Sequence, residues 1–271
     1  SALNQKTKRE YEIVVCAPDK ETLEVAKKYK KVKIFKDLGK GKSFALNQIF
    51  SKIDSEILIL SDGDVFVNEY AVESILQEFK NPLIGCVTGR PIPKEDKSEK
   101  WGYWANFLFE AAHKLRESAY NKNKFLECTG YLFAFRKKII SQIPTDVAED
   151  TIIPYYFWEK GYSIGYAPNA KVYVKNVDNH KDWLNQKVRC AKAHETLEKY
   201  VDTKITPRVK SFSNEAKGFF DAIFYAKSIK QFWWTIELIF MRATLWFKVF
   251  KETKLQNKKY SDNWKRVEST K

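Results

Sequence analysis

Two carboxylates one residue apart are the clearest candidates for chemistry in this sequence. Asp62 and Asp64 flank Gly63 directly after the apolar run at residues 56–60, a pattern typical of a central parallel strand. Open α/β sheets bind ligands at the carboxyl ends of such strands. Carboxylate oxygens suit Mg²⁺ or Mn²⁺, and these ions in turn hold diphosphate oxygens. The alternative is a solvated acidic turn, because Asp-Gly is a common turn pair.

A second acidic pair, Glu149 and Asp150, lies at the start of a predicted helix over residues 149–160. A carboxylate held there could be a general base, which removes the proton from an acceptor hydroxyl so that the oxygen can attack the anomeric carbon of a sugar. The alternative is structural, because acidic side chains stabilise the amino end of a helix through its dipole.

Basic and amide side chains are candidates for binding a phosphorylated ligand. Gln186 and Arg189 lie on a predicted helix. A guanidinium near a diphosphate would stabilise the departing nucleotide, although an ordinary basic helix face is the alternative. The glycine-rich loop at residues 39–42 lacks the GxxxxGK[ST] spacing of a Walker-type phosphate loop. A flexible loop there could still bring Lys42 or Asn47 to the phosphorylated ligand.

The elements that must position these groups alternate between strands and helices in the first half of the chain. Apolar β-branched runs predict strands, and apolar residues at helical spacing predict the helices between them. This order indicates a doubly wound, mostly parallel α/β sheet. Strands are expected at residues 11–15, 32–35, 56–60, 85–88, 162–166 and 171–174, an extended segment at 125–135, and helices at 21–29, 42–53, 69–79, 101–118 and 149–160.

Beyond residue 182 the sequence is mostly helical. Residues 219–250 are rich in aromatic side chains but carry charges at intervals. One helical stripe is apolar, and with Trp233, Trp234 and flanking lysines it predicts an amphipathic helix in a membrane interface. Packing of the stripe on the α/β domain is the alternative. The stripe consists of Ile236, Ile239, Phe240, Ala243, Trp246, Phe247 and Phe250.

The composition limits the classes of binding partner and the cellular compartments that are expected for this protein. The net charge of +14 favours polyanions such as nucleic acid, anionic lipid headgroups or phosphorylated small molecules, or it serves solubility alone. The four cysteines form no CxxC pair and the three histidines have no ligand spacing, so neither a zinc site nor a disulfide framework is expected. The sequence shows no secretory signal and no uncharged apolar run of about 18 residues, which predicts a cytoplasmic location.

The order of these stretches resembles the family 2 inverting glycosyltransferases with the GT-A fold. The similarity covers roughly residues 4–192, and its middle part is closest to the hyaluronan, chitin and cellulose synthase branch. It rests on the stretches YEIVV, GKGKSFALN, EILILSDGDVFV, IGCVTGR, FLECTGYLFAFRKK, AEDTIIPYYFWEKGYSIGYAPNAKVY and QKVRC.

The resemblance implies a nucleotide-diphosphate sugar as donor and Mg²⁺ or Mn²⁺ as cofactor. Asp64 would coordinate the metal together with Asp62, which would also contact the donor. Asp150 would be the catalytic base, with Glu149 supporting it. The other residues expected at the donor site are Asp19, Lys42, Asn47, Gly63, Gly130, Gln186 and Arg189, of which Arg189 would face the diphosphate.

The sequence departs from the family pattern in several places. Cys190 stands where the QxxRW motif has a Trp that lines the acceptor site, and the transmembrane helices of the polymerising enzymes are absent. Both differences favour transfer of one or a few sugars over processive synthesis. At Asp19 the sequence reads CAPD where the family usually has DDGS. The first strand of the family, with its nucleotide-contacting loop, is also not in view.

The sequence therefore predicts a GT-A catalytic domain at residues 1–180, a helical membrane-interface region at 181–250 and a polar basic tail at 251–271. We expect a metal-dependent inverting glycosyltransferase, peripheral on the inner face of the membrane, with a saccharide or lipid-linked acceptor. A processive polysaccharide synthase-like enzyme is the nearest alternative. A nucleotidyltransferase is disfavoured because no GxGxR signature is present. A non-catalytic basic module that binds nucleic acid would have no use for the acidic pairs, so no nucleic-acid partner is expected.

Overall fold

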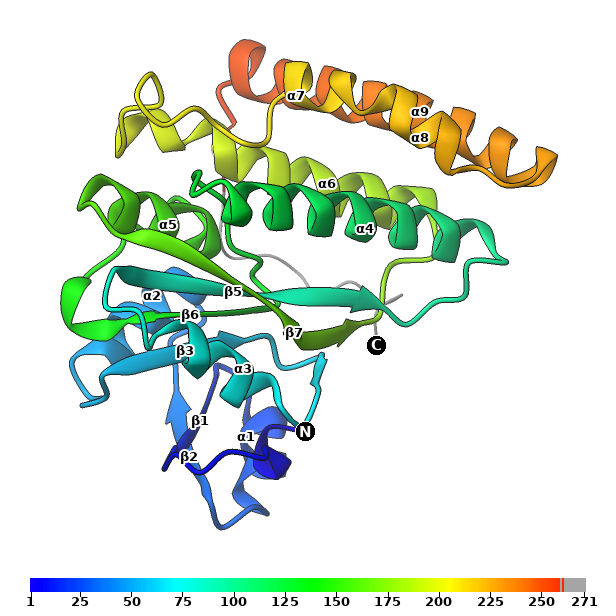
Figure 1. The fold of residues 1–271 in the computed structure, drawn as a ribbon. Helices are drawn as coiled ribbons and strands as arrows, with labels where there is room; N and C mark the ends of the chain where they lie inside the picture. The colour runs from blue at the N-terminus through cyan, green and yellow to red at the C-terminus, as the bar shows by residue number, and fades with distance from the viewer. Residues whose placement is uncertain (259, 261–271) are drawn as a thin grey trace.

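The computed structural model shows an α/β core covered on one side by layered helices (Figure 1). It describes residues 1–258 and 260, without the side chains of residues 217 and 219–221. Five strands form one sheet in the order β3-β6-β5-β7-β4, and β1 and β2 form a separate parallel pair. The α/β class predicted from the sequence is confirmed. The strands are β1 (Ile13–Ala17), β2 (Val32–Lys36), β3 (Ile57–Ser61), β4 (Phe66–Val67), β5 (Ile84–Pro93), β6 (Leu132–Arg136) and β7 (Ser163–Val174).

Helices pack on both faces of the five-stranded sheet and in further layers beyond one of them. The first half of the chain forms α1 (Lys20–Lys27), α2 (Lys42–Phe50) and α3 (Ala71–Glu78), and α5 (Glu149–Glu159) precedes β7. The covering layers are α4 (Lys100–Asn121), α6 (His180–Glu195), α7 (Phe212–Lys217), α8 (Phe219–Tyr225) and α9 (Ile229–Phe250). Short turns of helix complete the chain: η1 (Ala2–Asn4), η2 (Lys137–Ile139), η3 (Leu197–Lys199) and the π-helical η4 (Lys251–Leu255).

The direction of several strands differs from the mostly parallel sheet that the sequence predicted. β3 pairs with β6 in antiparallel register, with Ile57 opposite Arg136, and it stands at one end of the described strand order instead of in the centre. β6 is also antiparallel to β5, whereas β5 and β7 are parallel. An apolar run indicates that a strand is covered, and it carries no information on which way the neighbouring strands run.

β7 is one continuous strand where the sequence predicted two. The pattern predicted a break near Pro168 and Asn169, because these residue types favour turns. The strand instead continues through both, and the pairing of β5 with β7 shifts register between Thr88 and Arg90. Such an irregularity absorbs a residue that does not fit a regular ladder. Residues 125–131 remain a loop, which leads into β6.

Three apolar clusters hold the molecule together. Phe133 and Phe135 of β6 are fully buried with Phe157 of α5 on one face of the sheet. A second cluster joins α3 to the other face around Ile75. The third lies between the helices of the covering layers and includes Trp104, with its neighbours Tyr103, Trp183, Val188, Leu238, Leu245 and Val249.

Buried hydrogen bonds fix the orientation of α9 on this third cluster. The indole nitrogen of Trp104 donates to the carbonyl oxygen of Trp234 at 2.7 Å, and the Tyr103 hydroxyl lies 2.7 Å from the Thr235 hydroxyl. Each such bond contributes about 1 kcal/mol, and leaving one partner unsatisfied in the interior costs more. One face of α9 is therefore firmly attached to α4.

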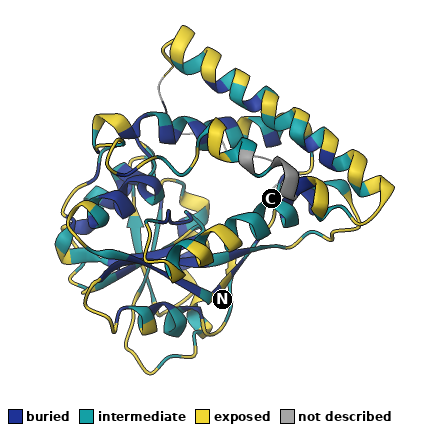
Figure 2. Cartoon of the chain, turned by 45° about the horizontal axis from the view of Figure 1, so that its top comes forward, coloured by how far each residue is buried: buried dark blue, intermediate teal, exposed yellow. Residues whose placement is uncertain are grey.

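A second apolar stripe of α9 faces solvent, and exposed residues recur along the helix (Figure 2). Phe240 and Phe247 are each 70% exposed, and Phe250 is 55% exposed. Trp246, which the sequence placed on the same stripe, instead donates its indole N–H to the Glu215 carboxylate at 2.9 Å. No helix within residues 1–258 is both long and apolar enough to cross a bilayer.

Candidate functional site

Lys42 joins two acidic segments that lie far apart in the sequence. Its ammonium nitrogen lies 2.7 Å from Asp62 Oδ1, just beyond the end of β3, and 2.7 Å from Glu149 Oε1, the first residue of α5. The Glu149 side chain is only 5% exposed. Burial by itself lowers the pKa of Lys42, but the charges of Glu149 and Asp62 outweigh it and raise that pKa above its usual value. Lys42 is therefore a fixed cation between two fixed carboxylates.

The loop and first turn of α2 place Lys42 at this point. Gly41, directly before it, has φ of 105°, a conformation that favours glycine. The Ser43 hydroxyl donates to the Val147 carbonyl at 3.1 Å. The Asn47 amide exchanges two hydrogen bonds with the backbone of Ile143, at 2.8 and 2.9 Å. Asn47 was expected to contact the donor, but the structure gives it this structural partner, which ties α2 to the segment before α5.

The Tyr131 phenol marks the place where the acidic segments converge. Burial raises the pKa of Tyr131, and so do the nearby charges of Cys190, Asp62, Asp64 and Asp150, so all four groups lie within electrostatic reach of one side chain. The Ser61 hydroxyl at the end of β3 donates to the Tyr131 carbonyl at 3.0 Å. Tyr131 was not among the predicted site residues, and its position directly after Gly130 was the one signal for it in the sequence.

Gly130 lies against the proposed base. A Cβ atom at this position would be 3.0 Å from Asp150 Oδ2, so any larger residue would press on that carboxylate. The Gly130 carbonyl oxygen lies 3.5 Å from Lys42 Nζ. The structure thus brings together Lys42, Asp62, Gly130 and the Glu149–Asp150 pair, with Asp64 close by. We call this group the acidic cluster.

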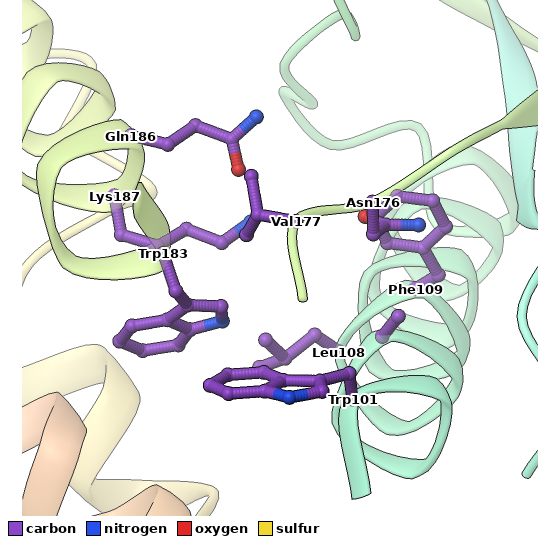
Figure 3. A pocket seen from close by; sticks show the side chains of 9 residues that line it. Trp101, Leu108, Phe109, Asn176, Val177, Trp183, Gln186 and Lys187 are labelled. Atoms are coloured by element: carbon purple, nitrogen blue, oxygen red, sulfur yellow. The ribbon is translucent and has the colours of Figure 1, made fainter. Parts of the chain in front are cut away.

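Helix α6 forms a second wall of the site. Cys190 reaches the surroundings of Tyr131, as its effect on the pKa of that phenol shows. The Arg189 guanidinium lies over the Tyr260 ring at 5.7 Å and donates to the Tyr260 hydroxyl at 3.3 Å. Tyr260 is itself buried, so this residue of the predicted polar tail belongs to the packed structure, while residues 261–271 lie outside the described part. Gln186 lines a small hollow between α4 and α6 (Figure 3).

Asp19 has a structural role at the start of α1. Its carboxylate accepts a hydrogen bond from the Thr22 backbone at 2.8 Å and so caps the helix. The neighbouring Pro18 lies next to Gly39, where an added Cβ would be 3.4 Å away, so the Asp19 loop borders the loop that leads to Lys42. Contact between Asp19 and a nucleotide base stays a prediction.

Asp62 and Asp64 fit the donor set of a magnesium-type ion. Asp64 is exposed, and Asp62 is half-buried with one oxygen held by Lys42. Within residues 1–258 no group of three or more His, Cys, Asp or Glu side chains is arranged as a complete metal site. Mg²⁺ is usually bound through only one or two carboxylates, with phosphate oxygens and water completing its shell. The carboxylates of Asp62 and Asp64, together with the diphosphate of a bound donor, would match this coordination.

Comparison with known proteins decides the family. Residues 1–143, just over half of the chain, match the family model described as glycosyl transferase family 2. The chain belongs to glycosyl transferase family 2. It is also 23% identical over 165 residues to the O-antigen chain rhamnosyltransferase RfbN of Salmonella typhimurium, a match that covers 56% of this chain and 52% of that protein. The chain therefore spans about half the length of this curated relative.

The family match ends before several residues of the site. It includes Lys42, Asp62, Asp64 and Gly130 and stops short of Asp150 and helix α6. For a member of glycosyl transferase family 2, the acidic cluster at the end of β3 is where a sugar nucleotide is expected. The contribution of α5 and α6 to that site depends on the contacts described above.

Lys42→Met should destabilise the protein by about 2–3 kcal/mol. Breaking a fully buried ion pair costs about 3–5 kcal/mol, and Lys42 keeps part of its side chain in solvent. Urea unfolding measures the change. The matched control is Lys40→Met in the same loop, which removes only a cation held over the Phe44 ring and should cost at most about 1 kcal/mol. Equal losses for both variants would contradict a bridging role for Lys42.

Proposed function

We propose that this chain transfers a glycosyl group, with inversion, from a nucleotide-diphosphate sugar to an acceptor hydroxyl. Membership of glycosyl transferase family 2 supports glycosyl transfer. The observation that carries the proposal is the Lys42 bridge, because it holds Asp62 at the end of β3 beside Glu149 and hence beside Asp150. The residue that we propose for metal and donor binding therefore lies near the carboxylate that we propose as the proton acceptor.

The proposed reaction is a single displacement. The acceptor oxygen attacks the anomeric carbon, the bond from that carbon to the diphosphate oxygen breaks, and Asp150 takes the hydroxyl proton. Asp150 Oδ2 borders Gly130, where no side chain obstructs the approach. Glu149, held by Lys42, fixes the first turn of α5 and so the position of its neighbour. Arg189 faces the leaving diphosphate from α6.

The proposed cofactor is Mg²⁺ or Mn²⁺, held by Asp64 with Asp62. When bound, the ion neutralises part of the charge on the departing nucleotide diphosphate. Lys42 adds a second positive charge beside Asp62, at 2.7 Å, and so keeps that carboxylate in a fixed orientation.

We further propose a saccharide acceptor in surface polysaccharide synthesis, with the enzyme bound peripherally to the inner face of the membrane. The name of the Salmonella relative, an O-antigen chain rhamnosyltransferase, supports a saccharide acceptor. The solvent-facing stripe of α9 supports the membrane contact, because exposed lysines flank it at both ends. These are Lys227 and Lys230 before the stripe and Lys251 and Lys254 after it. Apolar side chains between cations are complementary to an anionic lipid surface.

Asp150→Asn should lower the turnover number by about 10²–10⁴-fold, because the amide cannot accept the acceptor proton. Donor binding, measured by calorimetry, should change little, since Asn preserves the shape beside Gly130. Asp54→Asn, a substitution of an exposed carboxylate, is the matched control and should leave turnover unchanged. Near wild-type transfer by Asp150→Asn would refute the assignment of the base.

Chelation with EDTA should abolish both transfer and calorimetric binding of the donor, and added Mg²⁺ or Mn²⁺ should restore both. Asp64→Asn should raise the metal concentration needed for half-maximal donor binding, because one of two carboxylate ligands is lost. If neither EDTA nor Asp64→Asn changes the affinity for the donor, this metal site is excluded.

Vesicles of anionic phospholipid should co-sediment with the protein, and the double variant Phe240→Glu, Phe247→Glu should lose at least about tenfold in binding. Burying a Phe side chain in lipid contributes about 1.5–3 kcal/mol, and a carboxylate is in addition repelled by anionic headgroups. Leu115→Glu, on an exposed apolar residue of α4, is the control and should bind normally.

Two results would overturn the membrane proposal. One is failure of the wild-type protein to bind anionic vesicles. The other is a stable dimer that the double variant dissociates, which would make a second copy of the chain the occupant of the α9 stripe.

A further inference from the structure

A small hollow lies between α4 and α6 (Figure 3). Trp101 and Phe109 of α4 and Trp183 of α6 form its apolar walls, and Gln186 and Lys187 complete it. The Phe109 ring, which lines the hollow, contacts the Tyr131 ring with centroids 6.1 Å apart. The hollow therefore adjoins the site through Tyr131.

Lys187 points its ammonium group into this hollow, and the Gln186 amide points the same way (Figure 3). Within residues 1–258 and 260, the Lys187 ammonium has neither a hydrogen-bond partner nor an ion-pair partner. The other lysine on the same stretch of α6, Lys192, is paired with Glu252 at 3.1 Å. Lys187 is half-buried, and a partly desolvated ammonium without a counter-charge costs stability.

Charged groups of both signs surround Lys187, and none of them is paired with it. Burial lowers the pKa of Lys187 to about 8; Cys190 opposes this shift, Arg242 and Lys210 add to it, and Glu215 opposes it. Glu215 is already engaged in an ion pair with Arg242. An anion entering the hollow would supply the missing counter-charge.

The size of the hollow limits the group that can enter. The free space between its side chains is about 10 Å³, which suits one water-sized group such as a phosphoryl oxygen. An ammonium is a compact point charge with three donors and is well suited to phosphate, and Gln186 adds an amide donor. The surroundings favour one oxygen of a phosphate group over a whole sugar.

We propose that Lys187, with Gln186, is the anchoring site for a phosphate group of the acceptor. The assignment of the phosphate to the acceptor rests on the proposed glycosyl transfer. The assignment of Lys187 and Gln186 as a phosphate site does not depend on it. The acceptor phosphate binds between α4 and α6, and the rest of the acceptor passes the Phe109–Tyr131 pair to reach Asp150. Lys187 positions the acceptor and takes no part in proton transfer.

The first test measures phosphate binding alone. Inorganic phosphate is titrated calorimetrically into the full chain in EDTA without donor, for wild type, Lys187→Met and the matched control Lys181→Met, an exposed lysine of the same helix. Binding should weaken at least tenfold in Lys187→Met only. Absence of binding to the wild type, or equal binding by Lys187→Met, would overturn the site. Acetate should bind much more weakly than phosphate, and tighter binding of acetate would overturn the phosphate assignment.

The second test combines stability with kinetics. Lys187→Met should raise the melting temperature, because it removes an unpaired, half-buried charge, while it raises KM for a phosphate-bearing acceptor at least tenfold with donor KM unchanged. A purely structural lysine would show the opposite, a lower melting temperature. A raised donor KM would assign the phosphate to the donor and overturn the acceptor site. Because phosphate titration needs neither metal nor transfer, its result is independent of the Asp150→Asn experiment.

Discussion

The site depends on one ammonium group held between two carboxylates. Asp62 belongs to the end of β3 and Glu149 to the start of α5, and like charges at such short range would repel without Lys42 between them. The remaining contacts support this geometry: the positive φ of Gly41 directs the chain into α2, and Ser43 and Asn47 tie α2 to the segment before α5. Asp150 is placed by its neighbours more than by contacts of its own.

Helix α6, one of the helices that cover the sheet, brings positive charge to the neighbourhood of the site. α6 carries Lys187 and Arg189 two residues apart, and it is held in place by the aromatic cluster that includes Trp104 and Trp183. Tyr260 closes over the Arg189 guanidinium. The acidic residues therefore come from the end of β3 and the start of α5, and the cations from α2 and α6, so a phosphorylated ligand would lie between these elements.

The sequence predicted the parts of the site that local pattern specifies. The apolar run before Asp62, the acidic pair at the start of α5 and the helix carrying Arg189 are all local features, and each forms as expected, although β3 lies at one end of the strand order. Long-range pairing was not predictable: the antiparallel partner of β3 is β6, more than seventy positions away. For the same reason the pattern could not show that Asn47 binds backbone, that Lys42 bridges two acids, or that Tyr131 lies near Cys190 and three carboxylates.

The two faces of α9 together would set how far the site stands from a membrane. Its inner face is fixed to α4 by buried hydrogen bonds, so a helix resting on lipid by its outer face would hold the rest of the protein at a set height. α4 and α6 lie between α9 and the sheet (Figure 1), and packed helices are spaced about 8–10 Å apart, so the acidic cluster would stand at least one such spacing from the bilayer. A growing saccharide would then be modified at this height above the membrane. The packing of the helices would therefore determine how much of the saccharide must extend from the membrane before its end reaches the site.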